Sequence, residues 1–442
     1  MAQGERRVAI QPEASRMEKL AAREVRRDVY LRTGRVPSIE KADDFISPGV
    51  IAVAVKGDRR IADRSLQTNA LALSPQSFLL KTLPGASPGS RTWWIIGGDP
   101  QGALFGAYRF AEHLGIRFYL HGDVVPVDLM TDLPDIYEVG SPILSTRGFL
   151  PFHDFPEGPD WWTRDDYLAY VAQLAKLRMN FIGLHTYSWK PGGEPLVWIG
   201  LPSDFDLFGQ VTFSYPSSWA NMQRDLIGYS PMTTRDFVGG SAQLFPTNAF
   251  GSEVMAGLMP QPTTLSDCNL LRDVFATAKG LGIKTCIGTE TPLYFPSVLE
   301  EHLVKSGRSP TADSVKRELY QGIFARLNTV APIDYYWLWT MEEWTWYGNT
   351  DEEFDLALSD IRAATDALSD VGAPIQLAIS GWVLGPDHDR AAFDRLLPKD
   401  VPIASLNQVV GNSPIEIANQ TITGRPKWAI PWVENDFQMT IP

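Results

Sequence analysis

The segment Asp334-Tyr-Tyr-Trp-Leu-Trp-Thr-Met-Glu-Glu-Trp-Thr-Trp346 decides the fold that this sequence predicts. Aromatic and β-branched residues favour strands, so the pattern indicates a buried strand over residues 334–340. Two adjacent carboxylates, Glu342 and Glu343, follow this strand directly. In an extended segment neighbouring side chains point to opposite sides, so only one of the two should face a pocket. The alternative is a Trp-rich core strand followed by a solvated loop.

Strand-like and helix-like segments alternate on both sides of this stretch, from residue 147 onward. Such alternation is typical of a parallel sheet built by right-handed crossovers and closed into a barrel. An eight-stranded barrel needs one more strand than the pattern supplies, so the sequence predicts a (β/α)8-type barrel truncated before its eighth strand. The predicted strands are 147–152, 180–185, 284–289, 334–340, 375–380, 403–406 and 427–432, and the predicted helices are 165–176, 265–281, 312–330, 351–371 and 387–397.

Residues 1–140 predict a separate small α/β domain before the barrel of residues 141–442. Its last predicted helix follows Gly97 and Gly98 and carries an apolar stripe that ends at Leu114, with Gly115 as its C-cap. These glycines lack the spacing of a dinucleotide site, and no acidic residue follows at the required distance, so no nucleotide cofactor is predicted. The other predicted elements are strands 8–10, 50–55, 77–81 and 92–96 and a helix over 15–33.

The segment 186–264 is far longer than an ordinary strand-to-helix connection. It carries several Trp, Gly and Pro residues. Because it would leave the carboxyl end of a barrel strand, we expect this insertion to cover the face on which such barrels place their sites.

The composition excludes several classes of protein. A formal net charge of -13 argues against nucleic acid as a partner, since phosphates attract basic surfaces. No apolar run is long enough to span a bilayer, and the first residues lack the apolar core of a signal peptide. The location therefore stays open; a cleaved leader would make the protein periplasmic or secreted. The two cysteines, Cys268 and Cys286, form no disulfide framework or metal motif and are expected to be buried thiols.

Indole rings beside carboxylates suit carbohydrate chemistry. Sugar C–H faces stack on aromatic rings, and a positioned Asp or Glu moves the proton. Glu342 is the predicted general acid, with Trp339 and Trp344 as walls of the pocket. Glu290 follows another strand and is the predicted second carboxylate, while Glu343 is catalytic in one interpretation and solvated or Arg-paired in the other.

Further polar residues follow the ends of predicted strands. Glu434 and Asp436 after the seventh strand compete with Glu290, Glu434 as a catalytic group and Asp436 as a sugar ligand. Residues His185, His153 and Asp154 are expected to bind substrate hydroxyls. A zinc site would need three convergent ligands, and the usual motif spacings are missing, so no metal is predicted.

Two blocks resemble known glycoside hydrolases. The segment 102–119 is similar to the closing helix of the domain that precedes the barrel in bacterial β-hexosaminidases and α-glucuronidases. Residues 145–154 and 167–185 are similar to the first strand, first helix and second strand of those barrels. The resemblance implies the same two-domain architecture, a sugar substrate, and a substrate-contacting role for Arg147. Alternatively, Arg147 is a salt-bridged residue at the amino end of its strand, too deep to touch a ligand.

Around the predicted active site the resemblance is to xylan α-glucuronidases. Residues 287–292 resemble the end of their third strand with its acidic residue, and residues 337–347 resemble the strand that bears the catalytic acid. This resemblance maps the catalytic roles onto Glu290 and Glu342. The adjacent Asp-Glu pair of hexosaminidases is replaced here by Glu342-Glu343, which argues against acetamido-assisted chemistry.

The sequence therefore predicts a glycoside hydrolase, exo-acting on a plant or algal polysaccharide fragment, that uses paired carboxylates and no cofactor. If the sugar is a uronic acid, its carboxylate needs a basic side chain, and the candidates are Arg147, Lys190 and Arg235. The competing hypothesis is a non-catalytic carbohydrate-binding or accessory protein with a degenerate barrel site. A nucleotide-dependent oxidoreductase lacks its fingerprint.

Overall fold

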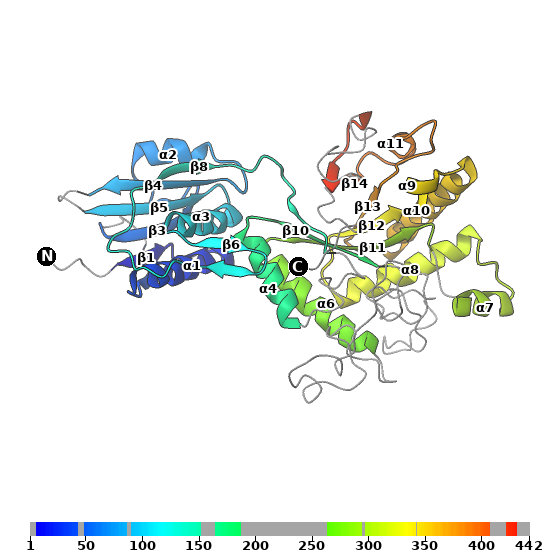
Figure 1. Ribbon diagram of the computed structural model, residues 1–442, viewed down its shortest axis with the longest axis horizontal. Helices are drawn as coiled ribbons and strands as arrows, with labels where there is room; N and C mark the ends of the chain where they lie inside the picture. The colour runs from blue at the N-terminus through cyan, green and yellow to red at the C-terminus, as the bar shows by residue number, and fades with distance from the viewer. Residues whose placement is uncertain are drawn as a thin grey trace, which may run out of the picture. The chain divides into compact units, whose positions relative to one another are not determined.

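The computed structural model divides the chain into two compact units, which are described separately (Figure 1). The first unit comprises Met1–Gly148 together with Leu168–Phe181 and Thr277–Ile283. The second comprises Phe149–Tyr167, Ile182–Ala276 and Lys284–Pro442. The residues that the structure describes are 6–42, 48–85, 90–151, 164–186, 263–293, 297–341, 343–406 and 421–430.

A six-stranded mixed sheet forms the centre of the first unit, in the order β2-β1-β3-β5-β4-β8. The strands β2, β1, β3 and β5 run parallel, whereas β4 pairs antiparallel with both β5 and β8. A separate hairpin pairs β6 with β7. The strands are β1 (Arg7–Ile10), β2 (Ser38–Lys41), β3 (Val50–Val55), β4 (Phe78–Pro84), β5 (Arg91–Gly97), β6 (Arg117–Tyr119), β7 (Gly122–Val124) and β8 (Tyr137–Gly140).

The two long helices of this unit begin with well-formed caps. In α1 (Arg16–Thr33) the Ser15 hydroxyl accepts from the Glu18 backbone amide, and the Glu18 carboxylate accepts from the Ser15 backbone amide. In α3 (Pro100–His113) the Asp99 carboxylate accepts from the Gly102 amide at 2.6 Å. These bonds satisfy amide donors that a helix start leaves open, which is why the two helices begin where they do.

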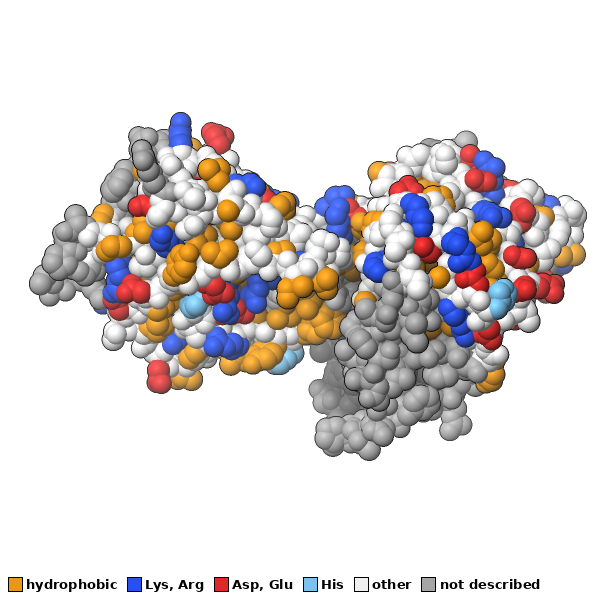
Figure 2. Space-filling model, turned by 90° about the horizontal axis from the view of Figure 1, so that it is seen from above, with side chains coloured by type: hydrophobic (Ala, Val, Ile, Leu, Met, Phe, Trp, Pro, Cys, Tyr) orange, Lys and Arg blue, Asp and Glu red, His pale blue; other side chains and the backbone are white. Residues whose placement is uncertain are grey.

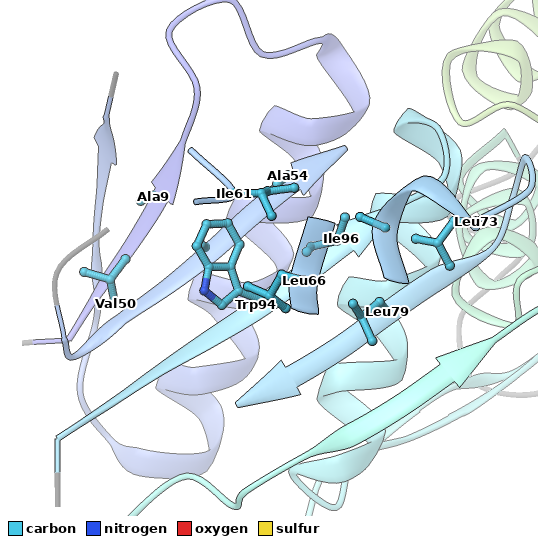
Figure 3. Packing of buried hydrophobic residues seen from close by; sticks show 11 residues of the cluster. Ala9, Val50, Ala54, Ile61, Leu66, Leu73, Leu79, Trp94 and Ile96 are labelled. Atoms are coloured by element: carbon cyan, nitrogen blue, oxygen red, sulfur yellow. The ribbon is translucent and has the colours of Figure 1, made fainter. Parts of the chain in front are cut away.

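The central strands β3 and β5 of the first unit's sheet are buried on both faces. Figure 3 shows one of these cores, where Trp94 lies among aliphatic residues of β3 and β5 and Leu66 of α2 (Arg64–Leu71). On the opposite face Gly106 of α3 lies against Ile95 of β5, so close that an added Cβ would be 3.0 Å from it. Successive residues of β5 therefore point to different cores, as the pleat requires.

A seven-stranded sheet forms the centre of the second unit, with the strands in sequence order from β9 to β15. The paired registers from β11 to β15 are all parallel. The seven described strands are consistent with seven strands of a (β/α)8-type barrel, the fold class that the sequence predicted. The strands are β9 (Gly148–Phe149), β10 (Phe181–Thr186), β11 (Lys284–Thr291), β12 (Tyr335–Thr340), β13 (Gln376–Gly381), β14 (Ile403–Leu406) and β15 (Lys427–Ile430).

Helices α8 and α10 pack against each other beside this sheet (Figure 1). α10 begins with a second capping box, formed by Thr350 and Glu353, and ends at Gly372 in the left-handed conformation. The described helices after residue 160 are α4 (Arg164–Lys176), most of which belongs to the first unit, α6 (Thr263–Gly280), α7 (Ser297–Lys305), α8 (Asp313–Val330), α9 (Glu343–Tyr347), α10 (Asp351–Val371) and α11 (Ala392–Leu396).

The α/β fold class is confirmed, and the differences concern short elements. The sequence predicted neither α7 nor α9, and α11 is shorter than the expected 387–397. In the first unit it missed β2, α2 and β6 to β8. Each of these elements has nine residues or fewer, too few to establish a periodic pattern against the background of the loops.

The surface mixes charges of both signs. Figure 2 shows Lys and Arg side chains interspersed with Asp and Glu on the visible face of each unit. Several of them form ion pairs, such as Arg317 with Asp370 at 2.6 Å. No helix in the described part of the chain has the length and apolarity that crossing a membrane requires.

Asp28 is a charged residue in the core of the first unit. It lies fully buried in α1, where its Oδ1 accepts from Arg27 at 2.9 Å and its Oδ2 has no hydrogen-bond partner among the described residues. Burial, with the neighbouring Glu24 carboxylate, raises the pKa of Asp28 to about 7, against the opposing effect of Arg27. The folded state therefore takes up a proton between about pH 4 and pH 7, so the cost of an ionised Asp28 is largest above pH 7.

We expect Asp28→Asn to raise the free energy of unfolding by about 1–3 kcal/mol at pH 8, because it removes a buried charge while keeping the side-chain shape. The difference in unfolding free energy between Asp28→Asn and wild type should decrease towards pH 5, where wild-type Asp28 is protonated in the folded state. Urea unfolding at both pH values measures this difference, with the exposed Asp128→Asn as the control. A gain that does not depend on pH would contradict the assignment.

Candidate active site

Strand register places three polar or aromatic residues in one row across the second unit. Glu290 of β11 pairs with Trp339 of β12, and Trp339 pairs with Ser380 of β13. Directly paired residues of parallel strands project from the same face of a sheet. The row lies at the carboxyl ends of the strands, where α/β barrels carry their functional groups.

The neighbours of Glu290 point to the opposite face. The hydroxyl of Thr289 lies 2.8 Å from Tyr336 Oη, and Thr291 Oγ1 donates to Asp360 of α10 at 3.0 Å. Tyr336 in turn meets Phe324 of α8 edge to face. Because side chains alternate along a strand, these helix-side contacts require the Glu290 side chain to project away from the helices.

His185, near the end of β10, joins the same face. Its ring centroid lies 4.7 Å from that of Trp339, with the planes tilted by 39°. Trp337 also lies on this face and meets Trp339 edge to face at 5.3 Å. The exposed fractions of His185, Trp339 and Glu290 are only 2%, 3% and 9%. The structure therefore brings these three predicted site residues together on one buried face.

Gly288 makes this arrangement sterically possible. It pairs with Trp337, whose indole Nε1 donates to the carbonyl of Leu184 on β10 at 3.1 Å. The indole must cross β11 to reach β10, and a Cβ on Gly288 would collide with the Trp337 carbonyl and ring. Glycine is therefore required for close approach.

Ser380 belongs to the same row, and the sequence analysis did not single it out as a candidate. It is fully buried, and its Oγ has no hydrogen-bond partner among the described residues. A buried hydroxyl without a partner is costly unless a ligand or water satisfies it. The sequence offered one indication of its position, because Ser380 is the last residue of the predicted strand 375–380. The pairing of Ser380 with Trp339 depends on the register between two strands, which a single sequence does not reveal.

Glu343 and Trp344 lie in a different local structure from the one expected. β12 ends at Thr340, and Glu343 begins α9 rather than continuing an extended segment. Its side chain is exposed, whereas Trp344 is buried with 2% exposure. An acidic residue is favourable in the first turn of a helix, and burial of the apolar Trp344 side chain stabilises this short helix.

Five predicted site residues lie outside the described residues. They are Glu342, His153, Asp154, Glu434 and Asp436. The insertion 186–264 also lies almost wholly outside the described part of the chain, which resumes at Thr263. The roles predicted for these residues stay predictions.

Arg147 makes its contacts within the first unit. Its guanidinium donates to the backbone carbonyl of Arg178 at 2.8 and 3.0 Å, to the Leu144 carbonyl at 2.5 Å and to Gln76 Oε1 at 2.9 Å. Burial, together with the charge of Arg178, lowers its pKa. Arg147 lies at the amino end of its strand, since β9 begins at Gly148, and the acceptors of these bonds are carbonyl and amide oxygens rather than the carboxylate of an ion pair.

Among the described residues, no group of three His, Cys, Asp or Glu side chains could hold a metal ion. Cys286 is a free, buried thiol on β11, and burial raises its pKa well above the ordinary value. A buried neutral thiol is a poor nucleophile. Glu290 offers a carboxylate for proton transfer or nucleophilic attack, beside the Trp339 indole and the His185 imidazole.

Comparison with solved structures identifies the architecture. The GH20 β-N-acetylhexosaminidase of Streptomyces coelicolor A3(2) superposes with a TM-score of 0.51 at 11% identity, covering 98% of this chain and 71% of that one. This chain shares its fold. A β-hexosaminidase of Streptomyces plicatus, solved with its product GlcNAc, has a TM-score of 0.50 at 10% identity, with coverages of 98% and 70%.

A GH138 enzyme that targets pectin rhamnogalacturonan II also matches, with a TM-score of 0.51 at 10% identity. The match covers 96% of this chain but only 42% of that enzyme. No protein-family model matches the sequence, and no curated protein matches it. At such identities the likeness shows the fold alone.

We expect Gly288→Ala to lower the free energy of unfolding by about 1–3 kcal/mol, because the added methyl group must displace Trp337. Urea unfolding followed by tryptophan fluorescence measures both the stability and the Trp environment. Gly280→Ala is the matched control, since a Cβ there meets only ordinary contacts at 3.4 Å and alanine favours a helix. If Gly288→Ala and Gly280→Ala were equally stable, the Trp337 indole could not lie directly over residue 288 of β11.

Proposed function

We propose that this protein is a glycoside hydrolase whose site lies at the carboxyl ends of β10 to β13. The observation that carries the proposal is the common face of Glu290, Trp339 and His185. A carboxylate beside an indole provides both a group for proton transfer or attack and a surface for a sugar ring. The fold shared with glycoside hydrolases supports this assignment by analogy.

In the proposed mechanism Glu342 is the general acid that protonates the leaving oxygen. Glu290 is the nucleophile, or the base that activates water. Retaining enzymes hold the two carboxyl groups about 5 Å apart, and inverting enzymes hold them further apart to admit water. His185 and Ser380 would hydrogen-bond sugar hydroxyls, which would give the buried Ser380 hydroxyl a partner. Glu434 and Asp436 are the alternative partners from the last predicted strand.

The choice between a neutral sugar and a uronic acid depends on whether a basic side chain reaches the site. A uronate needs a basic side chain in the pocket, and Arg147 instead uses its donors on carbonyl oxygens and Gln76 within the first unit. The row of Glu290, Trp339 and Ser380 contains no lysine or arginine. We propose an exo-acting hydrolase of a plant or algal polysaccharide fragment; if its sugar is a uronic acid, Lys190 and Arg235, which lie outside the described residues, are the candidates to bind the carboxylate.

The test is hydrolysis of a panel of aryl glycosides and aryl glucuronides by wild type and by Glu342→Gln and Glu290→Gln. We expect each variant to lower kcat by about 10²-fold or more, because an acid or a nucleophile is lost, while sugar affinity stays near wild type. The wild-type pH profile should be bell-shaped, since the acid must be protonated and its partner ionised.

Glu343→Gln is the matched control, because it removes the neighbouring carboxylate from an exposed position on α9. We expect its turnover to stay near wild type. Unchanged turnover in Glu342→Gln would overturn the assignment of the acid. Sugar binding without turnover in wild type would instead favour the accessory, carbohydrate-binding function.

A further inference from the structure

A second carboxylate, Asp360, lies directly behind Glu290 on the helix side of the sheet. It belongs to α10 and is fully buried. Its Oδ2 accepts three hydrogen bonds: from Tyr320 Oη at 2.6 Å, from Thr291 Oγ1 at 3.0 Å and from the Leu293 backbone amide at 3.1 Å. One carboxylate oxygen thus connects α8, α10 and the end of β11.

Two of these three donors hold the chain immediately after Glu290. Thr291 is the next residue, and Leu293 lies just beyond Pro292. Because proline has no amide hydrogen, Leu293 supplies the first backbone donor after the strand. Asp360 therefore fixes the chain on both sides of Pro292, at the point where β11 leaves the sheet.

The contact at Thr291 determines where Glu290 can point. Consecutive Cα atoms are about 3.8 Å apart with fixed peptide geometry, so a displacement of Thr291 is transmitted to Glu290. On the other side, Thr289 is held by Tyr336 at 2.8 Å. Glu290 is thus the middle residue of a Thr-Glu-Thr triplet whose two outer side chains are both fixed to the helix side.

The ionised form of Asp360 is destabilised by burial. Burial raises its pKa to about 6, although the hydrogen bond from Tyr320 and the charge of Lys316 on α8 oppose this effect. The buried Tyr336 is the other titratable group of the sheet that interacts with it. Its Oδ1 has no hydrogen-bond partner among the described residues. A buried carboxylate destabilises a fold unless its contacts compensate, so its use at this point needs a reason.

We propose that Asp360 is a positioning residue for Glu290, which it holds in the orientation for reaction by fixing Thr291 and Leu293. This inference rests on the proposed catalytic role of Glu290, but the orientation of the side chain can be measured without turnover. Asp360 itself lies on the opposite face of the sheet and would not touch the sugar.

Two matched threonines on β11 separate positioning from stability. Thr291→Val removes the hydroxyl that Asp360 holds. Thr285→Val removes an equally buried hydroxyl at the amino end of the same strand, where Thr285 Oγ1 donates to the Pro332 carbonyl at 2.7 Å. Thr291→Val loses the bond to Asp360, and Thr285→Val loses at least two, because Thr285 Oγ1 also accepts from the Asp334 amide at 3.2 Å. The control is thus the more heavily perturbed of the two, but only Thr291→Val acts beside Glu290. Asp360→Asn is the third variant and keeps the side-chain shape.

The first measurement is the titration of the Glu290 carboxyl group by 13C NMR, assigned with Glu290→Gln, in the full-length chain. We expect Thr291→Val and Asp360→Asn to move its midpoint, whereas Thr285→Val leaves it unchanged. The second measurement is turnover, for which we expect about a 10- to 100-fold lower kcat with little change in KM, as for a misplaced catalytic group.

The outcomes distinguish the two proposals. If wild type hydrolyses no glycoside, the proposed function fails, and the carboxyl titration still tests the positioning of Glu290. If Thr291→Val changes the Glu290 titration and kcat no more than Thr285→Val does, the positioning role is overturned. If Asp360→Asn does not fold, Thr291→Val carries the test alone, because Leu293 and Tyr320 still donate to Asp360 in that variant.

Discussion

The parallel register of β11, β12 and β13 is the constraint on which the candidate site depends. It places Glu290 beside Trp339 and Trp339 beside Ser380. A slip of one residue in β11 would turn Glu290 towards the helices and bring Thr289 and Thr291 onto the face that carries Trp339 and Ser380. Two features oppose such a slip. Among the described residues, the hydroxyls of Thr289 and Thr291 bond to partners on the helix side, and the Trp337 indole passes over Gly288.

Sequence patterns predicted what depends on periodicity and missed what depends on tertiary contacts. The long helices α8 and α10 and the strands β10 to β14 lie close to their predicted ranges, because apolar periodicity and helix capping are local properties. The positions of Glu290 and His185 near strand ends were predictable for the same reason, since both strands are clear in the sequence. Ser380 and Asp360 were not, because a buried serine or aspartate has no distinctive sequence neighbourhood. The start of α9 at Glu343 depends on burial of Trp344, which the local sequence does not specify.

The two buried aspartates show how surroundings set the cost of a charge. Asp28 and Asp360 are both fully buried, and burial is the largest cause of the raised pKa in each. Asp28 lies near the carboxylate of Glu24, which adds like-charge repulsion, and its pKa is raised to about 7. Asp360 instead receives three hydrogen bonds and the attraction of Lys316, and its pKa reaches only about 6. Hydrogen bonds to the ionised form thus offset part of the desolvation cost, which is why Asp360 can act as a fixed acceptor near neutral pH.

The fold and the chemistry of this chain rest on different kinds of residue. A sheet such as that of the second unit requires apolar side chains of suitable volume, and many sequences satisfy this requirement, as the match at 11% identity illustrates. A reacting carboxylate cannot be exchanged in this way, because its charge, reach and orientation all matter. Fold likeness therefore supports sugar chemistry only by analogy. The specific support comes from Glu290, whose orientation is fixed by its neighbours on the strand, and from the ring of Trp339 beside it.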